Sequence, residues 1–201
     1  FFHLGRSRYA VAIADVSGKG VPASLLMAIC QTNLRHFVKR AKSPVEVLVK
    51  LDRDLNERMR KDMFITLFLG FIDIAEDTLT YSRAGHEPGL MLRNSEKDGP
   101  GVEILRGEGM ALGMVPDEIF EQALGVQTVP FHIGDSLALF TDGVTETTNG
   151  DGEEFSLTRL TALLEGSADK SPESFNAGLL RDLETFAGDT KDRDDVTLIT
   201  V

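Results

Sequence analysis

Apolar positions follow two periods along the chain, and the change from one to the other marks its elements. Residues 8–14 (RYAVAIA) form a short apolar run that stops at Asp15, which is the pattern of a buried strand. Residues 21–40 then carry apolar side chains at helical spacing. A second helix begins at the capping signal of Ser43, so the pattern predicts a helical hairpin over residues 21–61.

Strand patterns dominate the middle of the chain. Residues 64–72 are apolar on both faces and predict a central strand of a covered sheet. Residues 79–84 alternate as its partner, residues 90–92 are expected to continue the meander, and residues 94–101 are expected to form a loop. The remaining expected elements are strands at residues 126–132 and 136–141, helices at 156–165 and 171–187, and a final strand at 196–201.

The order of these elements indicates the fold class. Runs of strands lie between helical pairs, whereas a Rossmann fold would alternate strand and helix strictly. We therefore expect an α+β fold in which helices cover antiparallel sheets. The 201 residues, 42% of them hydrophobic, are enough for one domain with a sizeable core.

Composition excludes several partners and compartments. A formal net charge of -11 argues against nucleic-acid binding, which needs a positive surface. No apolar run is long enough to span a bilayer, so we expect no direct membrane insertion. The single cysteine, Cys30, cannot form an internal disulfide, which favours a reducing, cytoplasmic location.

Three aspartates, Asp15, Asp142 and Asp194, each lie at the end of an expected strand. If those strands are neighbours, the three carboxylates converge, and their mutual repulsion requires a cation. Oxygen ligands select Mg²⁺ or Mn²⁺, and no His or Cys cluster offers a zinc site. Taken singly, an aspartate at a strand end is also typical of an ordinary turn.

The sequence around these acids resembles a known family. The matching blocks occur in the family's order and together span nearly the whole chain: residues 14–23 (ADVSGKGVPA), 79–88 (LTYSRAGHEP), 111–114 (ALGM), 140–146 (FTDGVTE) and 194–197 (DDVT). On these residues the chain resembles the bacterial SpoIIE-like and RsbU-like branch of the PPM phosphatases.

This resemblance implies two packed antiparallel β-sheets flanked by helical pairs and a metal-dependent phosphoserine/phosphothreonine protein phosphatase. By resemblance, Asp15 bridges two Mn²⁺ or Mg²⁺ ions and Val16 offers its main-chain carbonyl. Asp142 and Asp194 complete the catalytic metal site, and the adjacent Asp195 either joins them as a ligand or supports them.

Two departures from the family pattern affect the expected activity. Ser17 stands where eukaryotic relatives have a histidine, so the leaving-group proton must come from a metal-bound water or a group not identified. The family's Gly-Gly-Asp-x-x-Asp segment is also absent before Phe1. We therefore expect residues 1–201 to be a catalytic domain that lacks its first strand, binds its second metal weakly and belongs to a longer multidomain protein.

Partners are implied only by the resemblance. They are a phosphorylated anti-anti-sigma factor or similar signalling protein as substrate, an upstream sensor or receiver domain, and a second copy that dimerises through the first helical hairpin. Two alternatives stay open: a catalytically weak or inactive partner-switching binding module, and a metal-dependent hydrolase of small phosphoesters. His86, in a turn signal, is expected to make a structural hydrogen bond.

Overall fold

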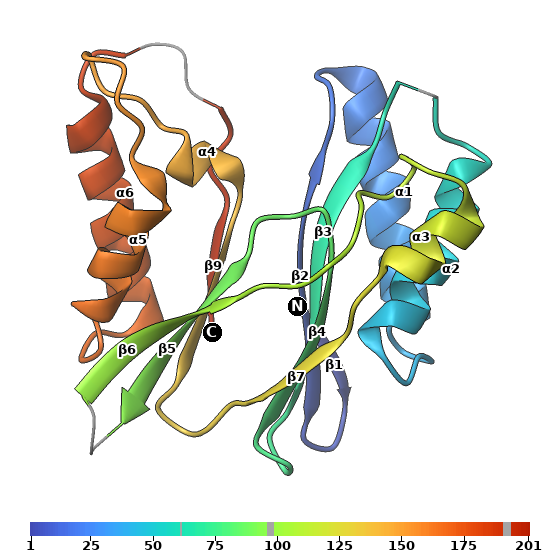
Figure 1. The fold of residues 1–201 in the computed structure, drawn as a ribbon, viewed down its shortest axis with the longest axis horizontal. Helices are drawn as coiled ribbons and strands as arrows, with labels where there is room; N and C mark the ends of the chain where they lie inside the picture. The colour runs from blue at the N-terminus through green and yellow to red at the C-terminus, as the bar shows by residue number, and fades with distance from the viewer. Residues whose placement is uncertain (61, 96–98, 191–193) are drawn as a thin grey trace. The chain divides into compact units, whose positions relative to one another are not determined.

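The computed structural model divides the chain into two compact units, each built from two separate stretches of sequence (Figure 1). The first unit comprises Phe1–His86 and Gly107–Ile133, and the second comprises Glu87–Arg106 and Gly134–Val201. The structure describes residues 1–60, 62–95, 99–190 and 194–201. None of the helices among these residues is long and apolar enough to cross a membrane.

The first unit contains a five-stranded antiparallel sheet with β3 at its centre, as the apolar pattern predicts. Residues 67–72 of β3 are all buried. The strand order is β1-β2-β3-β4-β7. The strands are β1 (Phe2–Gly5), β2 (Arg8–Val16), β3 (Ile65–Asp73), β4 (Thr78–Ala84) and β7 (Gln127–Pro130).

Helices α1 (Val21–Phe37), α2 (Pro44–Asn56) and α3 (Asp117–Ala123) cover one face of this sheet (Figure 1). The predicted hairpin is confirmed, although its second helix ends at Asn56, and α3 was not predicted. Buried leucines join helix to sheet in one apolar cluster, as Leu51 of α2 and Leu67 of β3 illustrate. This burial of apolar surface is the main force that fixes the hairpin on the sheet.

The predicted capping signal at α2 is also confirmed. The Ser43 hydroxyl accepts a hydrogen bond from the Glu46 amide at 3.3 Å. The Glu46 carboxylate, however, accepts from the amide of Lys42 at 2.8 Å, one residue before the cap. Both contacts satisfy amides at the entry to the helix, which lack partners inside it.

The second unit contains a four-stranded antiparallel sheet in the order β6-β5-β8-β9. Helices α5 and α6 cover one of its faces (Figure 1), and their buried residues form a second apolar cluster with β5 and β8. Its elements are β5 (Gly89–Ser95), β6 (Gly99–Leu105), β8 (Ser136–Phe140), α4 (Asp142–Thr145), α5 (Ser156–Glu165), α6 (Pro172–Ala187) and β9 (Leu198–Thr200).

Two predictions about the middle of the chain are wrong. Residues 90–92 do not continue the meander, because β5 pairs with β6 and β8 in the second sheet. Gly85 lies between β4 and β5 with a φ of +70°, and an added Cβ would approach the Ala111 amide nitrogen to 2.9 Å. The chain therefore turns out of the first sheet at a position that only glycine fits.

Within the stretch expected as a loop, residues 94–101, the described residues 94–95 and 99–101 belong to the β5–β6 strand pair instead. Asn94 lies opposite Pro100, and Ser95 lies opposite Gly99. Residues 96–98 of the expected loop lie outside the described residues. Pro100 has no N–H to donate. It is tolerated here because β6 is an edge strand, whose outer side pairs with no other strand of the sheet. With helices on two antiparallel sheets, the predicted α+β class is confirmed.

Candidate metal centre

Asp15 and Val16 lie at the end of β2 in the first unit. Nine consecutive residue pairs join β2 to β3, and the last two place Asp15 opposite Thr66 and Val16 opposite Ile65. The Asp15 side chain is exposed at this end of the ladder. A carboxylate and a neighbouring main-chain carbonyl are therefore presented together by a strand whose register is fixed over its whole length.

The turn after β2 is held by Ser17. Its amide donates to the Phe64 carbonyl at 3.0 Å, and its hydroxyl accepts from the Phe64 amide at 2.7 Å. Gly18 and Gly20 then take φ values of +90° and +79°, which lead the chain tightly into α1. Ser17 thus serves the backbone, in the place where a histidine would otherwise stand.

Asp142 is the first residue of α4 in the second unit, and Thr141 separates it from the end of β8. The buried Thr141 beside it donates its hydroxyl to the Asp195 carbonyl at 3.1 Å and accepts from the Thr197 amide at 3.0 Å. The Thr141 amide also donates to the Thr197 carbonyl at 3.1 Å. Thr141 therefore holds the segment that precedes β9, including the backbone of Asp195, next to Asp142.

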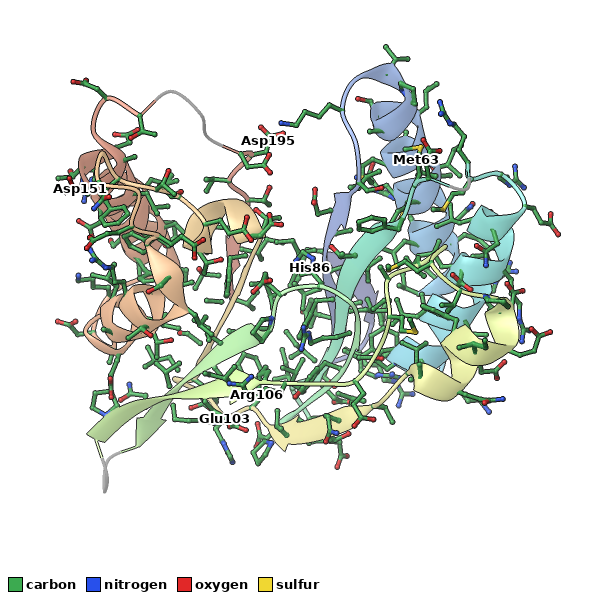
Figure 2. The ribbon with its side chains drawn as sticks, turned by 45° about the horizontal axis from the view of Figure 1, so that its top comes forward. Met63, His86, Glu103, Arg106, Asp151 and Asp195 are labelled. Carbon is green, nitrogen blue, oxygen red and sulfur yellow. The ribbon has the colours of Figure 1, made fainter. Side chains whose placement is uncertain are left out.

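Close packing strengthens this link between the two segments. A Cβ added to Gly143 would collide with the Asp195 carbonyl and would lie 3.4 Å from the Asp194 carbonyl carbon. Figure 2 shows Asp195 on the extended segment that leads into β9. Glycine at position 143 is thus the residue that lets the backbone of the acidic pair lie directly against α4.

Glu146, one turn after Asp142, experiences the resulting concentration of negative charge. Its pKa is raised above the ordinary value, first by partial burial and then by Asp142, Glu154 and Asp194. We did not predict a role for Glu146, although it stands four residues after Asp142 in the quoted block. That helical spacing was the available signal.

The predicted site residues are thus divided between the two units. Asp142, Asp194 and Asp195 come together in the second unit, whereas Asp15 and Val16 belong to the first. Among the residues that the structure describes, no group of three or more His, Cys, Asp or Glu side chains is arranged to hold a metal ion.

The chemistry of the donors fits a hard divalent cation. Every predicted ligand offers oxygen, as carboxylate or main-chain carbonyl, which suits Mg²⁺ or Mn²⁺ rather than a soft metal. Burial raises the pKa of Glu146 most, and the negative charges of Asp142, Glu154 and Asp194 raise it further. A cation bound near Glu146 would offset that negative charge.

His86 makes a structural hydrogen bond, as predicted. It is buried, and its Nδ1 lies 2.9 Å from the hydroxyl of Thr66, the residue opposite Asp15 (Figure 2). The Arg83 guanidinium donates to the His86 carbonyl at 2.8 Å. The imidazole therefore helps to hold β3 at the level of Asp15.

Comparison with known proteins shows relatives over most of the chain. The chain is 34% identical over 166 residues to phosphoserine phosphatase RsbU of Bacillus subtilis, a match that covers 80% of this chain and 47% of that protein. It is 30% identical over 228 residues to protein IcfG of Synechocystis, covering 100% of this chain and 34% of IcfG. The chain thus spans about a third to a half of the length of these relatives.

Solved structures share the fold. The SiaA-PP2C domain of Pseudomonas aeruginosa matches with a TM-score of 0.83 at 20% identity, covering 98% of this chain and 76% of that one. The catalytic domain of the serine/threonine phosphatase PstP, solved with two manganese ions, matches with a TM-score of 0.66 at 13% identity, covering 100% and 92%. The family model of stage II sporulation protein E (SpoIIE) matches residues 5–201, and the chain therefore belongs to the SpoIIE family.

Proposed function

We propose that this chain is the catalytic domain of a metal-dependent phosphoserine/phosphothreonine protein phosphatase. The observation that carries the proposal is the attachment of the segment before β9 to Thr141, beside Asp142, by three hydrogen bonds, one with the Asp195 carbonyl and two with Thr197. The backbone of an acidic pair about 50 residues away in sequence is thus held next to Asp142. The activity of the relative RsbU supports the same reading.

In this proposal, Asp15, the Val16 carbonyl, Asp142, Asp194 and Asp195 hold Mn²⁺ or Mg²⁺. The manganese in the PstP structure supports the choice of ion. When bound, such ions lower the pKa of a coordinated water and neutralise phosphoryl charge. The chain's own residues supply fixed positions: the β2–β3 ladder orients Asp15, and Thr141 orients the acids of the second unit.

The source of the leaving-group proton lies outside Ser17 in this proposal. The Ser17 hydroxyl already accepts a hydrogen bond from the Phe64 amide at 2.7 Å and so fixes the turn after β2. A second role in proton transfer would require it to leave that turn. We therefore assign Ser17 to holding the backbone beside Val16 and not to the chemistry.

The proposed substrate is a phosphorylated anti-anti-sigma factor or a similar signalling protein, in the cytoplasm. The similarity to RsbU supports this choice. We also propose that the domain works within a longer protein, downstream of a sensor or receiver domain. Dimerisation through the hairpin is supported by an exposed apolar stripe at helical spacing on α1, where Val21, Leu25 and Ile29 are 72%, 61% and 37% exposed.

The test is Mn²⁺-dependent release of phosphate from a phosphoseryl peptide and from a phosphorylated anti-anti-sigma factor. Asp142→Asn should lower the rate at least about 100-fold, because a neutral amide binds the cation poorly. The matched control is Asp151→Asn, an exposed aspartate in the same unit (Figure 2), which should keep the wild-type rate. An unchanged rate in Asp142→Asn would remove the metal-site assignment.

Metal binding can be measured separately from catalysis. A ligand that prefers the folded chain adds about 2.7 kcal/mol of stability at 100 times its Kd, so Mn²⁺ should raise the melting temperature. If Mn²⁺ stabilises the chain but no phosphoprotein is dephosphorylated, the chain acts as a binding module of the same fold and the enzymatic proposal fails.

A further inference from the structure

Asp52, on α2, is a fully buried acidic residue, with 0% of its surface exposed. Its Oδ1 accepts a hydrogen bond from the Gly113 amide at 2.9 Å, and its Oδ2 accepts from the Asn56 side chain at 3.1 Å. Asn56 donates in addition to Asp117 of α3 at 2.7 Å. The carboxylate thus joins α2 to the segment around Gly113, all within the first unit.

The segment that Asp52 holds is in turn bound to the central strand. Leu112, next to Gly113, exchanges two backbone hydrogen bonds with Ile65, the first residue of β3, at 3.0 and 2.8 Å. Ile65 lies opposite Val16 in the β2–β3 ladder. Hydrogen bonds therefore link Asp52 to Gly113 and the adjacent Leu112 to Ile65, which lies opposite Val16 at the end of β2.

Gly113 is suited to this contact. It has a φ of +82°, and an added Cβ would collide with the end of the Met59 side chain. A residue other than glycine would strain the backbone at this positive φ and would displace the end of the Met59 side chain. Glycine at position 113 therefore suits the backbone conformation in which its amide faces Asp52.

Stability alone does not explain a carboxylate at this position. The pKa of Asp52 is raised to about 6, chiefly by burial and also by Asp117, against the lowering effect of the Gly113 amide, Asn56 and the exposed Arg53. Arg53 is itself shared with Asp117 and Glu121. An apolar side chain of similar size would avoid the cost of burying a charge, so the acid points to a role other than packing.

We propose that Asp52 is a positioning residue for the end of β2: its carboxylate fixes Gly113 and Leu112, and through Ile65 it fixes the place of Asp15 and Val16. This inference rests on the function proposed above for the metal to which those residues are assigned. It connects the second helix of the hairpin to the end of β2 through the Asp52–Gly113 hydrogen bond, the adjacent Leu112 and its backbone pairing with Ile65.

Hydrogen exchange of the whole chain tests the proposal without metal. Asp52→Leu removes the acceptor, and Asp54→Asn is the matched control, since Asp54 lies on the same helix but contacts Asn33 and Arg58 instead. The amides of Gly113, Ile65 and Ser17 should exchange about tenfold faster in Asp52→Leu than in the control. Amides that join β4 to β7 should exchange at the same rate in both.

Two exchange results would overturn the proposal: equal rates at the three amides, or a uniform increase across the first unit, which would indicate a purely structural residue. If Asp52→Leu does not fold, Asp52→Asn replaces it. The amide oxygen of Asn can still accept from Gly113, so this variant should show a smaller increase at the same three positions, and no increase there would again contradict the proposal.

Titration with Mn²⁺ alone adds the functional measurement. Asp52→Leu or Asp52→Asn should raise the Kd for Mn²⁺ about tenfold, as loss of a residue that orients ligands does. An unchanged Kd in a folded variant would contradict the positioning role. If the wild-type chain binds no Mn²⁺, the proposed function fails, and the exchange rates still decide whether Asp52 positions the end of β2.

Discussion

The two units hold their acids in different ways. In the first, Asp15 lies in a strand that nine consecutive residue pairs join to β3, so its place is set by backbone hydrogen bonds along the whole strand. In the second, Asp194 and Asp195 precede the three-residue strand β9 and depend on one threonine and one glycine. The contrast implies that single side-chain changes should disturb the second set of acids far more than the first.

The strongest test of this contrast is Thr141→Val, which keeps the shape of the side chain. It removes the hydroxyl that donates to the Asp195 carbonyl and accepts from the Thr197 amide. Because Thr141 is buried, the unpaired groups should lower the free energy of unfolding by about 2–4 kcal/mol in chemical denaturation. Thr161→Val, which loses one hydrogen bond within α5, is the control and should cost much less.

A second test enlarges the glycine that packs against the acidic pair. Gly143→Ala should cost about 1–3 kcal/mol, because its Cβ meets a backbone carbonyl that cannot rotate away. Gly178→Ala in α6 has open space around its Cβ and should instead stabilise the chain by about 0.4–1 kcal/mol. Equal thermal shifts for the two variants would contradict the close approach of the Asp195 backbone to Gly143.

A third test concerns pH and the first unit. The pKa of Asp52 rises from 3.8 to about 6 on folding, so between these values the folded chain binds more protons and its stability falls as pH rises. The Asp52→Asn variant has no carboxyl at this position, so its stability does not fall with pH for this reason. The variant's free energy of unfolding, relative to wild type, should therefore rise by about 1–2 kcal/mol from pH 4 to pH 6 and become level only above about pH 7, where the folded carboxyl has lost its proton.

The matched control for this pH series is Asp54→Asn, on the same helix. A difference curve for Asp52→Asn that is flat with pH, measured by urea denaturation at several pH values, would show that the Asp52 carboxyl titrates normally in the folded chain.

The smallest effect is expected for Ser17→Ala. The hydroxyl that accepts from the Phe64 amide is lost, but the Ser17 amide still donates to the Phe64 carbonyl, and the ladder remains. We expect a loss of about 0.5–1 kcal/mol. A loss as large as that of Thr141→Val would contradict the view that the β2–β3 ladder holds Asp15 without help from the Ser17 hydroxyl.

The sequence was sufficient to predict elements in which the apolar pattern continues over many residues, such as α1, α2, β3 and α6. It failed for β6, because Gly99, Pro100 and Gly101 are typical of a loop and their pairing with β5 depends on tertiary contact. The change of sheet after β4 was missed for the same reason. Strand pairing is a property of the folded chain that the period of one strand does not encode.

For the candidate site, strand ends suggested the acids, and the structure places the Asp195 backbone against Thr141 and Gly143, beside Asp142. That these acids are metal ligands is still a prediction. The roles of Thr141, Gly143 and Asp52 could not be predicted, because each depends on a contact with a segment at least 50 residues away. The joint binding of a metal by Asp15 and the acids of the second unit stays a prediction.

The chain passes between the two units three times, at residues 86–87, 106–107 and 133–134. During synthesis, the first sheet therefore cannot close until β7 has emerged, well after Asp15 and the hairpin. The second sheet waits longer, because β9 pairs with β8 across about 60 intervening residues. The edge of β8 that later pairs with β9 therefore stays unpaired, beside Asp142, while α5 and α6 are synthesised. During that interval a chaperone or another strand could bind the exposed edge.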